Sequence, residues 1–247
     1  SLPFDLTGAQ KRSVKEIVGD MRSARPMNRL LQGDVGSGKT FVAICAMLLA
    51  VDSGCQAALM APTQILAEQH YLTFSKWLEP LGVRIGLATA DRKEDVNSSQ
   101  IIIGTHALLY EGVEFDDLGL VVVDEQHKFG VAQRGRLIQR GVMPDVLVMT
   151  ATPIPRTLSL TLYGDLAISV IDQLPPGRKP VETKLYRESS RINAYSLIKD
   201  ELKKGRQAYV VYPLVEESEK SDLQAATEAV DQLSAEIFPQ ARIGLLH

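Results

Sequence analysis

The sequence predicts an α/β fold with a mostly parallel sheet, organised as one complete unit followed by part of a second. Short apolar runs alternate with segments of helical periodicity almost from end to end, which is typical of βα units. The 247 residues exceed the usual size of one domain and fall short of two. A segment rich in proline and glycine at residues 173–180 breaks the alternation, so we expect residues 1–172 and 181–247 to fold as separate units.

The first unit is expected to supply the sheet and the helices that cover it. Its predicted strands are apolar runs bounded by polar or turn-forming residues: 28–32, 56–61, 84–88, 100–104, 119–124, 145–150 and 166–171. A helix is expected to begin after Thr7, a candidate N-cap. The two apolar stripes at helical spacing, which we interpret as core faces, are Val14, Ile17, Val18 and Met21, and Phe74, Trp77, Leu78 and Leu81.

The second unit repeats the alternation over a shorter length. We expect strands at 181–187, 207–213 and 241–246, and helices at 191–204 and 223–236. The last predicted strand is not followed by a helix. The sequence therefore predicts an incomplete second α/β unit.

Composition and charge limit the classes of function. Hydrophobic residues make up 45% and charged residues 23%, and the formal charge of -3 gives no overall basic footprint, so any contact with nucleic acid has to be local. Cys45 and Cys55 lie in or beside an apolar helical run, which favours free thiols over a disulfide or a metal site. We find no membrane helix and no leader pattern, so we expect a cytoplasmic protein without membrane contact.

The sharpest motif is a phosphate-binding loop between a predicted strand and a predicted helix. Its residues are Gly33, Asp34, Val35, Gly36, Ser37, Gly38, Lys39 and Thr40, in the pattern G-x-x-x-x-G-K-[ST]. Glycines let backbone N–H groups surround phosphate oxygens, and the helix N-terminus adds its positive end. Lys39 is expected to reach the terminal phosphates of ATP, and Thr40 to bind Mg²⁺.

A pair of acids follows another predicted strand. Asp124 is expected to hold Mg²⁺ through water, and Glu125 to polarise the water that attacks the γ-phosphate. An Asp-Glu pair after a strand is common by itself. Its occurrence beside an intact P-loop is what favours the catalytic interpretation.

Three further features are expected at the margins of the same crevice. Phe4 and Gln10 belong to a string ahead of the P-loop, where the Gln10 amide is suited to bind an adenine edge, although it also fits an ordinary polar helix position. Thr150 and Thr152 end another apolar run. Their hydroxyls are suited either to couple the nucleotide site to a second domain or to cap the next helix.

Six segments, taken in order, resemble the motifs of superfamily 2 helicases: Gln10, the P-loop, and residues 61–63, 104–106, 124–127 and 150–152. Residues 31–40 and 150–157 resemble the branch shared by the RecG family and the transcription-repair coupling factor. Asp124-Glu125-Gln126-His127 is similar to RecG, whereas the coupling factor has Glu-Glu-Gln after the Asp. Lys128 departs from the pattern, since RecG normally has Arg there. Residues 212–219 and 244–247 resemble the second motor domain of RecG.

The resemblance implies a RecA-like motor domain at residues 1–172 and the start of a second at 181–247. It implies ATP and Mg²⁺ as cofactors, with Lys39, Asp124 and Glu125 in catalysis. Gln126 and His127 would sense the γ-phosphate and relay its presence toward Thr150 and Thr152.

The resemblance also implies a DNA track that contacts the phosphate backbone, with Thr63, Thr105 and His106 as candidates. Arg134, Arg136 and Arg140 either join this track or form an exposed helix face, and the second interpretation is favoured. The implied activity is remodelling of stalled forks and Holliday junctions by a monomeric, nucleoid-associated bacterial protein. Single-stranded-DNA-binding protein is a partner expected from the family alone.

The chain lacks the wedge domain that the family places in front, and motifs V and VI with their arginine finger behind. Because such an arginine contributes roughly 10³ to 10⁵ in rate, we expect ATP to be bound and hydrolysed poorly. Three alternatives make distinct predictions. A GTPase switch predicts an N-K-x-D signature, which is missing, and a D-E-A-D RNA helicase is disfavoured by residues 124–127. An ATP-binding module without motor output stays open.

Overall fold

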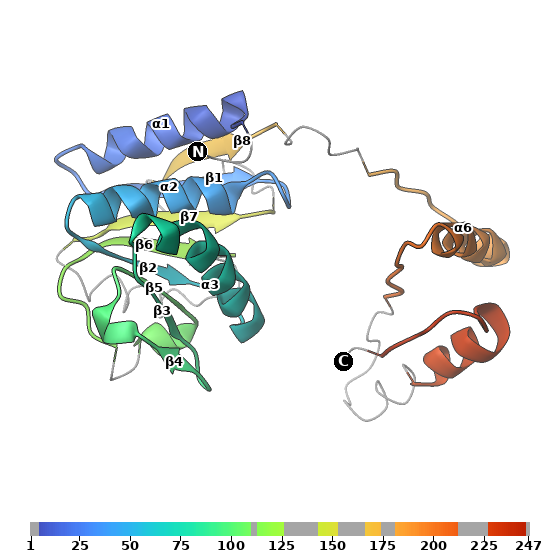
Figure 1. Cartoon of the computed structure of the whole chain (residues 1–247). Coiled ribbons are helices and arrows are strands. Elements are labelled where there is room, and N and C mark those ends of the chain that lie inside the picture. Colours follow the sequence, from blue (N-terminus) through green and yellow to red (C-terminus); the bar gives the residue numbers. More distant parts are fainter. Residues whose placement is uncertain are drawn as a thin grey trace. The chain divides into compact units, whose positions relative to one another are not determined.

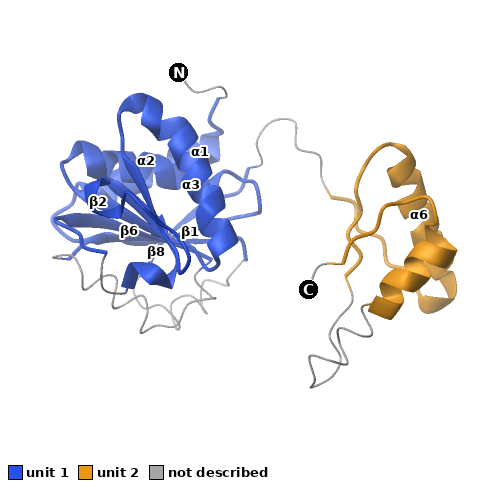
Figure 2. Ribbon diagram, turned by 60° about the horizontal axis from the view of Figure 1, so that its bottom comes forward, with its two compact units in different colours: residues 1–178 blue, residues 179–247 orange. Residues whose placement is uncertain are grey.

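The computed structural model describes residues 5–109, 113–125, 143–152, 166–173, 181–211 and 227–245. The chain divides into two compact units, residues 1–178 and 179–247 (Figure 2). The division falls inside the segment expected to join them.

Unit 1 is built on an eight-stranded sheet with the order β4-β3-β5-β2-β6-β7-β1-β8 (Figure 1). The strands are β1 Asn28–Gly33, β2 Gln56–Met60, β3 Ile85–Ala88, β4 Lys93–Glu94, β5 Ile101–Gly104, β6 Leu118–Asp124, β7 Asp145–Thr150 and β8 Ala167–Ile171. All neighbouring pairs are parallel except β3 with β4. The predicted α/β fold with a mostly parallel sheet is confirmed, strand by strand. Of these strands, only β4 was not predicted, because a strand of two residues is too short to show an alternating pattern.

The described residues of this unit form three long helices: α1 Gly8–Met21, α2 Lys39–Asp52 and α3 Gln64–Leu78. Short 3₁₀ turns follow at η1 Glu79–Leu81, η2 Val96–Ser98 and η3 His106–Leu109. Thr7 is the N-cap of α1, as predicted, because its hydroxyl accepts a hydrogen bond from the Gln10 backbone N–H.

The sheet is buried on both faces, as a parallel sheet requires. Alternate residues of β2 show this: Ala57 and Leu59 belong to one apolar cluster, and Ala58 and Met60 to another. The first cluster also contains the inner faces of α1, α2 and α3, which lie together on one side of the sheet (Figure 2). This layering fixes the strand ends, and therefore the loops that carry the motifs.

Unit 2 departs from the sequence prediction in its strands. The described part contains η5 Glu188–Ser190, α6 Arg191–Lys203 and a helix from residue 227 that ends in a π turn, η6 Leu233–Ile237. No strand forms at 181–187, 207–211 or 241–245, and those predictions are wrong for the described residues. The physical reason is that Val181, Leu185 and Tyr209 are 86%, 96% and 80% exposed, so these segments lack a packed neighbour with which to form a ladder.

Two further expectations from the sequence concern the cysteines and membrane-spanning helices. Cys45 and Cys55 are free and half-buried. Within the part of the chain that the structure describes, no helix is long and apolar enough to cross a bilayer.

Candidate nucleotide site

The candidate site lies where three neighbouring strands end. β7 lies between β1 and β6, with Gln32 paired to Thr150 and Asp124 paired to Met149. The P-loop follows β1, and the acidic pair follows β6. Since ligands of open parallel sheets bind beyond the carboxyl ends of the strands, the topology brings the predicted motifs to one place.

The P-loop turns sharply from β1 into α2. Gly36 and Gly38 have φ values of 73° and 92°, in the left-handed region that favours glycine. Gly38 is the N-cap of α2, and no side chain caps this helix. The first N–H groups of an α-helix have no acceptor within the helix, so this end is suited to bind an anion.

Close packing inside the loop excludes larger side chains. A Cβ at Gly33 would lie 2.6 Å from Ser37 Oγ, and a Cβ at Gly38 would lie 2.3 Å from Gln10 Nε2. Ser37 is fully buried, and its Oγ makes no hydrogen bond within the described residues. A buried hydroxyl without a partner is uncommon in proteins. Together these features fit a cradle that phosphate oxygens would complete.

Lys39 turns back onto its own loop. Its Nζ donates hydrogen bonds to the Gly33 and Asp34 carbonyl oxygens, at 2.7 and 3.1 Å. Burial lowers the pKa of Lys39, while the negative charges of Glu125, Asp124 and Asp34 oppose that shift. A cation held in this way, beside two carboxylates, is suited to transfer its hydrogen bonds to a phosphate group.

Asp124 and Glu125 lie at the end of β6 and differ in their surroundings and backbone conformation. Asp124 is only 9% exposed, and its Oδ2 lies 2.8 Å from Nε2 of His70, within hydrogen-bonding distance. Glu125 has a φ of 47°, in the left-handed region that is unusual for a residue with a side chain. Mg²⁺ is usually held by one or two carboxylates plus water and phosphate oxygens. Asp124 together with the Thr40 hydroxyl in the first turn of α2 fits that requirement.

Gln10 has both ends of its amide engaged by the protein. Its Oε1 accepts a hydrogen bond from the Thr7 N–H, and its Nε2 donates to the Ser37 carbonyl at 2.8 Å. Gln10 is therefore a buried link between α1 and the P-loop. An adenine edge would have to use the second lone pair of Oε1 and the second hydrogen of Nε2.

The threonines after β7 form a small hydroxyl cluster. Thr150 is buried, and its Oγ1 lies 2.9 Å from Thr152 Oγ1 and accepts a hydrogen bond from the Thr152 N–H. Because β7 lies between β1 and β6, this cluster is close to both the P-loop and the acidic pair.

The candidate DNA residues differ in accessibility. Thr63 is exposed and caps α3, since its Oγ1 accepts a hydrogen bond from the Leu66 N–H. Thr105 is 4% exposed, and its hydroxyl accepts a weak hydrogen bond from the Ala107 N–H. His106 is exposed. Thr63 and His106 are therefore the better placed of the three to meet a large ligand.

Several predicted site residues lie outside the described residues: Phe4, Gln126, His127, Arg134, Arg136 and Arg140. Sequence reasoning also missed two contacts. The Thr7-x-x-Gln10 pattern is typical of a capping box, which the structure contains. His70 carries no motif signal. Its position is seven residues beyond Thr63, and only the fold brings it to Asp124.

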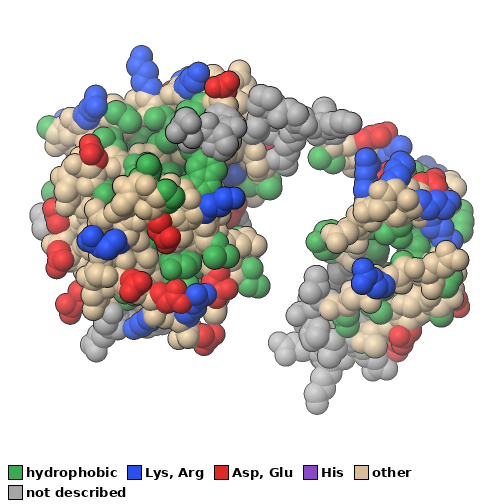
Figure 3. All heavy atoms as spheres, viewed as in Figure 1, with side chains coloured by type: hydrophobic (Ala, Val, Ile, Leu, Met, Phe, Trp, Pro, Cys, Tyr) green, Lys and Arg blue, Asp and Glu red, His purple; other side chains and the backbone are tan. Residues whose placement is uncertain are grey.

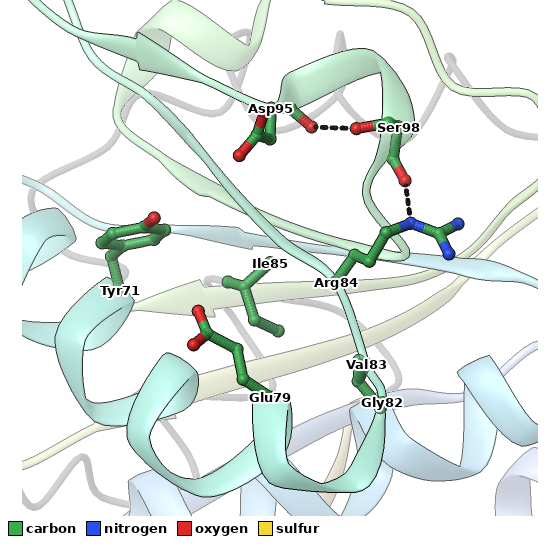
Figure 4. A pocket seen from close by; sticks show the side chains of 8 residues that line it. All are labelled: Tyr71, Glu79, Gly82, Val83, Arg84, Ile85, Asp95 and Ser98. Atoms are coloured by element: carbon green, nitrogen blue, oxygen red, sulfur yellow. Dashed lines mark hydrogen bonds between the residues drawn. The ribbon is translucent and has the colours of Figure 1, made fainter.

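A cavity of about 450 Å³ lies at the opposite edge of the sheet, where β3 begins (Figure 4). Its lining includes Tyr71 from α3, Glu79 from η1, and Arg84, which donates a hydrogen bond to the Ser98 carbonyl. The cavity shares no residue with the P-loop or with the acidic pair. The candidate nucleotide site is therefore the region at the carboxyl ends of the strands, which contains the P-loop and the acidic pair, and not this cavity.

Comparison with known proteins agrees with the motifs. ATP-dependent DNA helicase RecG of Aquifex aeolicus is 53% identical over 100% of this chain and 32% of its own length. The RecG protein of Synechocystis is 52% identical over 100% of this chain and 31% of its own. The chain thus spans about a third of the length of these relatives.

Structural comparison and a family model complete the assignment. A solved structure of RecG bound to a three-way DNA junction matches 96% of this chain and 32% of that one, with 43% identity and a TM-score of 0.80. The model of the DEAD/DEAH box helicase family matches residues 7–161. The RecG resemblance and the RecA-like fold are confirmed, and the chain belongs to the DEAD/DEAH box helicase family.

Proposed function

We propose that this chain is the ATP-binding part of a RecG-like DNA motor. The observation that carries the proposal is the uncapped N-terminus of α2, which follows β1, a strand separated from β6 by β7 alone. An open helix end preceded by a glycine loop attracts phosphate, and an acidic strand end supplies the metal ligand. Both are needed for a nucleoside triphosphate carried with Mg²⁺.

In this proposal the residues divide the work of binding and hydrolysis. The backbone N–H groups of residues 33–40 surround the phosphates, and Lys39 neutralises the terminal ones. Thr40 and Asp124 would hold Mg²⁺, which would supply charge neutralisation when bound. Glu125 orients and deprotonates the attacking water, while Gln126 and His127 report the γ-phosphate toward Thr150 and Thr152.

DNA is the proposed polymer substrate. The solved RecG relative was bound to a three-way DNA junction, which supports branched DNA as the class of substrate. Acidic and basic side chains are interspersed on the face of unit 1 drawn in Figure 3, which supports local contacts with the backbone, and not a broad basic surface. Thr63 and His106 are the proposed contacts, with Thr105 supporting their loop.

The finer assignments are also proposals. Residues 1–172 would form motor domain 1, residues 181–247 the start of motor domain 2, and residues 173–180 their linker. We propose a monomer that acts in the bacterial cytoplasm at the nucleoid, with single-stranded-DNA-binding protein as a partner. The 247 residues alone would bind ATP and hydrolyse it slowly, because the motifs that supply an arginine finger in the family are not among them.

Two alternatives predict different behaviour. A translocase of the coupling-factor type would respond to unbranched duplex DNA as strongly as to forks. An ATP-binding module without motor output would bind ATP and ignore both kinds of DNA. The Asp124-Glu125-Gln126-His127 sequence favours the RecG-like proposal over the first of these.

The test is ATP binding and turnover, measured with and without forked DNA, on this chain and on full-length RecG of Aquifex aeolicus as the reference. We expect this chain to bind a fluorescent ATP analogue, and its turnover to fall below the reference by about 10³-fold or more. Turnover equal to the reference would contradict the proposal of slow hydrolysis. No ATP binding would overturn the proposed function as a whole.

A further inference from the structure

A histidine from a neighbouring helix holds the acid at the end of β6. His70 lies on α3, and its Nε2 is 2.8 Å from Asp124 Oδ2. Both side chains are largely buried, with 11% and 13% of their surfaces exposed. None of the helicase motifs recognised in the sequence includes His70. This contact therefore adds a residue to the site.

The direction of the hydrogen bond follows from the chemistry of the two groups. An ionised carboxylate only accepts hydrogen bonds, so the His70 Nε2 must carry the hydrogen. One lone pair of Asp124 Oδ2 is then engaged, and the hydrogen bond restricts rotation of the carboxylate about its Cβ–Cγ bond. Oδ1 remains as the oxygen that can face a metal-bound water.

Packing fixes the histidine in turn. The His70 ring meets the Phe74 ring edge-on, with centroids 6.2 Å apart and an interplanar angle of 87°. Phe74 is fully buried in the apolar cluster beneath α3. The imidazole can therefore swing little, and the orientation of Asp124 is set by the position of α3 on the sheet.

We propose that His70 is a positioning residue that orients Asp124 toward the Mg²⁺ of a bound nucleotide. The proposal rests on the proposed function, because it assigns a role to Asp124 in the Mg²⁺ site. Groups of this kind, which do not touch the metal but hold its ligand, usually change metal affinity about 10- to 100-fold when they are removed.

The experiment compares His70→Phe with His70→Gln in this chain. Phe keeps a ring that can pack on Phe74 and removes the donor, whereas Gln offers an N–H that can reach the same oxygen. The affinity for a fluorescent ADP analogue is measured in EDTA and during a Mg²⁺ titration, and Mn²⁺ binding by the ADP complex is followed by electron paramagnetic resonance. We expect His70→Phe to need about 10-fold more Mg²⁺ or Mn²⁺ while its affinity in EDTA is unchanged. His70→Gln should recover most of the wild-type metal affinity.

Two reference variants separate failure of this proposal from failure of the proposed function. Asp124→Asn should lower the affinity for Mg²⁺ or Mn²⁺ at least as much as His70→Phe does. Lys39→Ala should weaken ADP binding with and without metal. If both references behave so, and His70→Phe keeps the wild-type metal dependence, His70 is not a positioning residue. A positioning role is equally excluded if both His70 variants only lower the melting temperature, since that is the result of a packing role. If Asp124→Asn leaves the metal dependence unchanged, the proposed function fails first.

Discussion

The three long helices in the described part of unit 1 begin in two different ways. The N-termini of α1 and α3 are capped by side chains, the hydroxyls of Thr7 and Thr63. α2 begins at Gly38 and has no side-chain cap. A cap of this kind contributes about 1 kcal/mol to stability, so α2 forgoes a common source of stabilisation. The difference indicates that the backbone N–H groups at the N-terminus of α2 are available to a ligand, whereas the caps of α1 and α3 stabilise the fold.

α2 can remain helical without a cap because its stability comes from burial. Val42, Ala43, Ala46 and Met47 are all at most 1% exposed in the core cluster. Helices in proteins are stabilised chiefly by such packing and less by their ends. The open end is therefore tolerated in α2, whereas it would cost more in the amphipathic α1.

The largest expected effect comes from removing the cation at the open end. Lys39→Ala should weaken the binding of an ATP analogue by about 10- to 100-fold, because a charge-assisted hydrogen bond contributes roughly 1.5–3 kcal/mol. Equilibrium titration of a fluorescent ATP analogue measures this change. An unchanged affinity would mean that the phosphates bind elsewhere.

Gly38→Ala should disturb both the loop and the fold. The φ of 92° strains any residue with a side chain, and the new Cβ would displace the Gln10 amide from 2.3 Å. We expect a loss of about 1–3 kcal/mol in the free energy of unfolding, together with weaker nucleotide binding. Gly54→Ala is the matched control, since Gly54 has a φ of 87° and open space around it. It should lose stability and keep its affinity for nucleotide.

Substitutions of Thr63 can separate its role as the N-cap of α3 from its proposed role in DNA contact. Thr63→Ala should lower the free energy of unfolding by about 1 kcal/mol through loss of the α3 cap. Thr63→Asp restores a cap and adds a negative charge, so it should recover stability and weaken DNA binding. Chemical denaturation and fluorescence anisotropy with forked DNA report the two quantities. If Thr63→Asp binds DNA as wild type does, Thr63 is a structural cap only.

The smallest expected effect is on the pH dependence of stability. Because burial lowers the pKa of Lys39 below 10.5, its charged form destabilises the nucleotide-free fold at neutral pH. Lys39→Met should then unfold at a slightly higher temperature than wild type near pH 7. This advantage should shrink as the pH rises through the lowered pKa toward 10.5, where the wild-type lysine loses its charge in both states. A difference in melting temperature that does not vary with pH would contradict this account.

Sequence predicted what depends on local pattern and missed what depends on tertiary contact. The buried strands of unit 1 were predictable, because a continuous apolar run such as Ile101–Ile103 has few other ways to be buried. In unit 2, Leu185 and Tyr209 lie in apolar runs that read as strands, yet no neighbouring strand pairs with them in the described part. A strand needs a partner, and a pattern in one segment does not contain that partner.

The candidate site shows the same difference between features that depend on local pattern and features that depend on tertiary contact. The P-loop and Asp124 were recognisable because their chemistry is contiguous in the chain. Gln10 was placed near the loop, but its bond to the Ser37 carbonyl depends on how α1 packs. His70 was not recognisable, since it lies 54 positions before Asp124 in the sequence and only the fold brings the two together.

The most direct test of the account is the change in melting temperature caused by ATP and Mg²⁺ across the three helix ends. A ligand that binds only the folded state raises its stability, by about 2.7 kcal/mol at a hundred times its dissociation constant. We predict that Thr7→Ala and Thr63→Ala melt earlier than wild type without ATP and show the full ATP-induced rise, whereas Lys39→Ala shows about half of that rise or less. An equal rise in Lys39→Ala, or its loss in Thr7→Ala, would contradict the claim that the open end of α2 is the phosphate site.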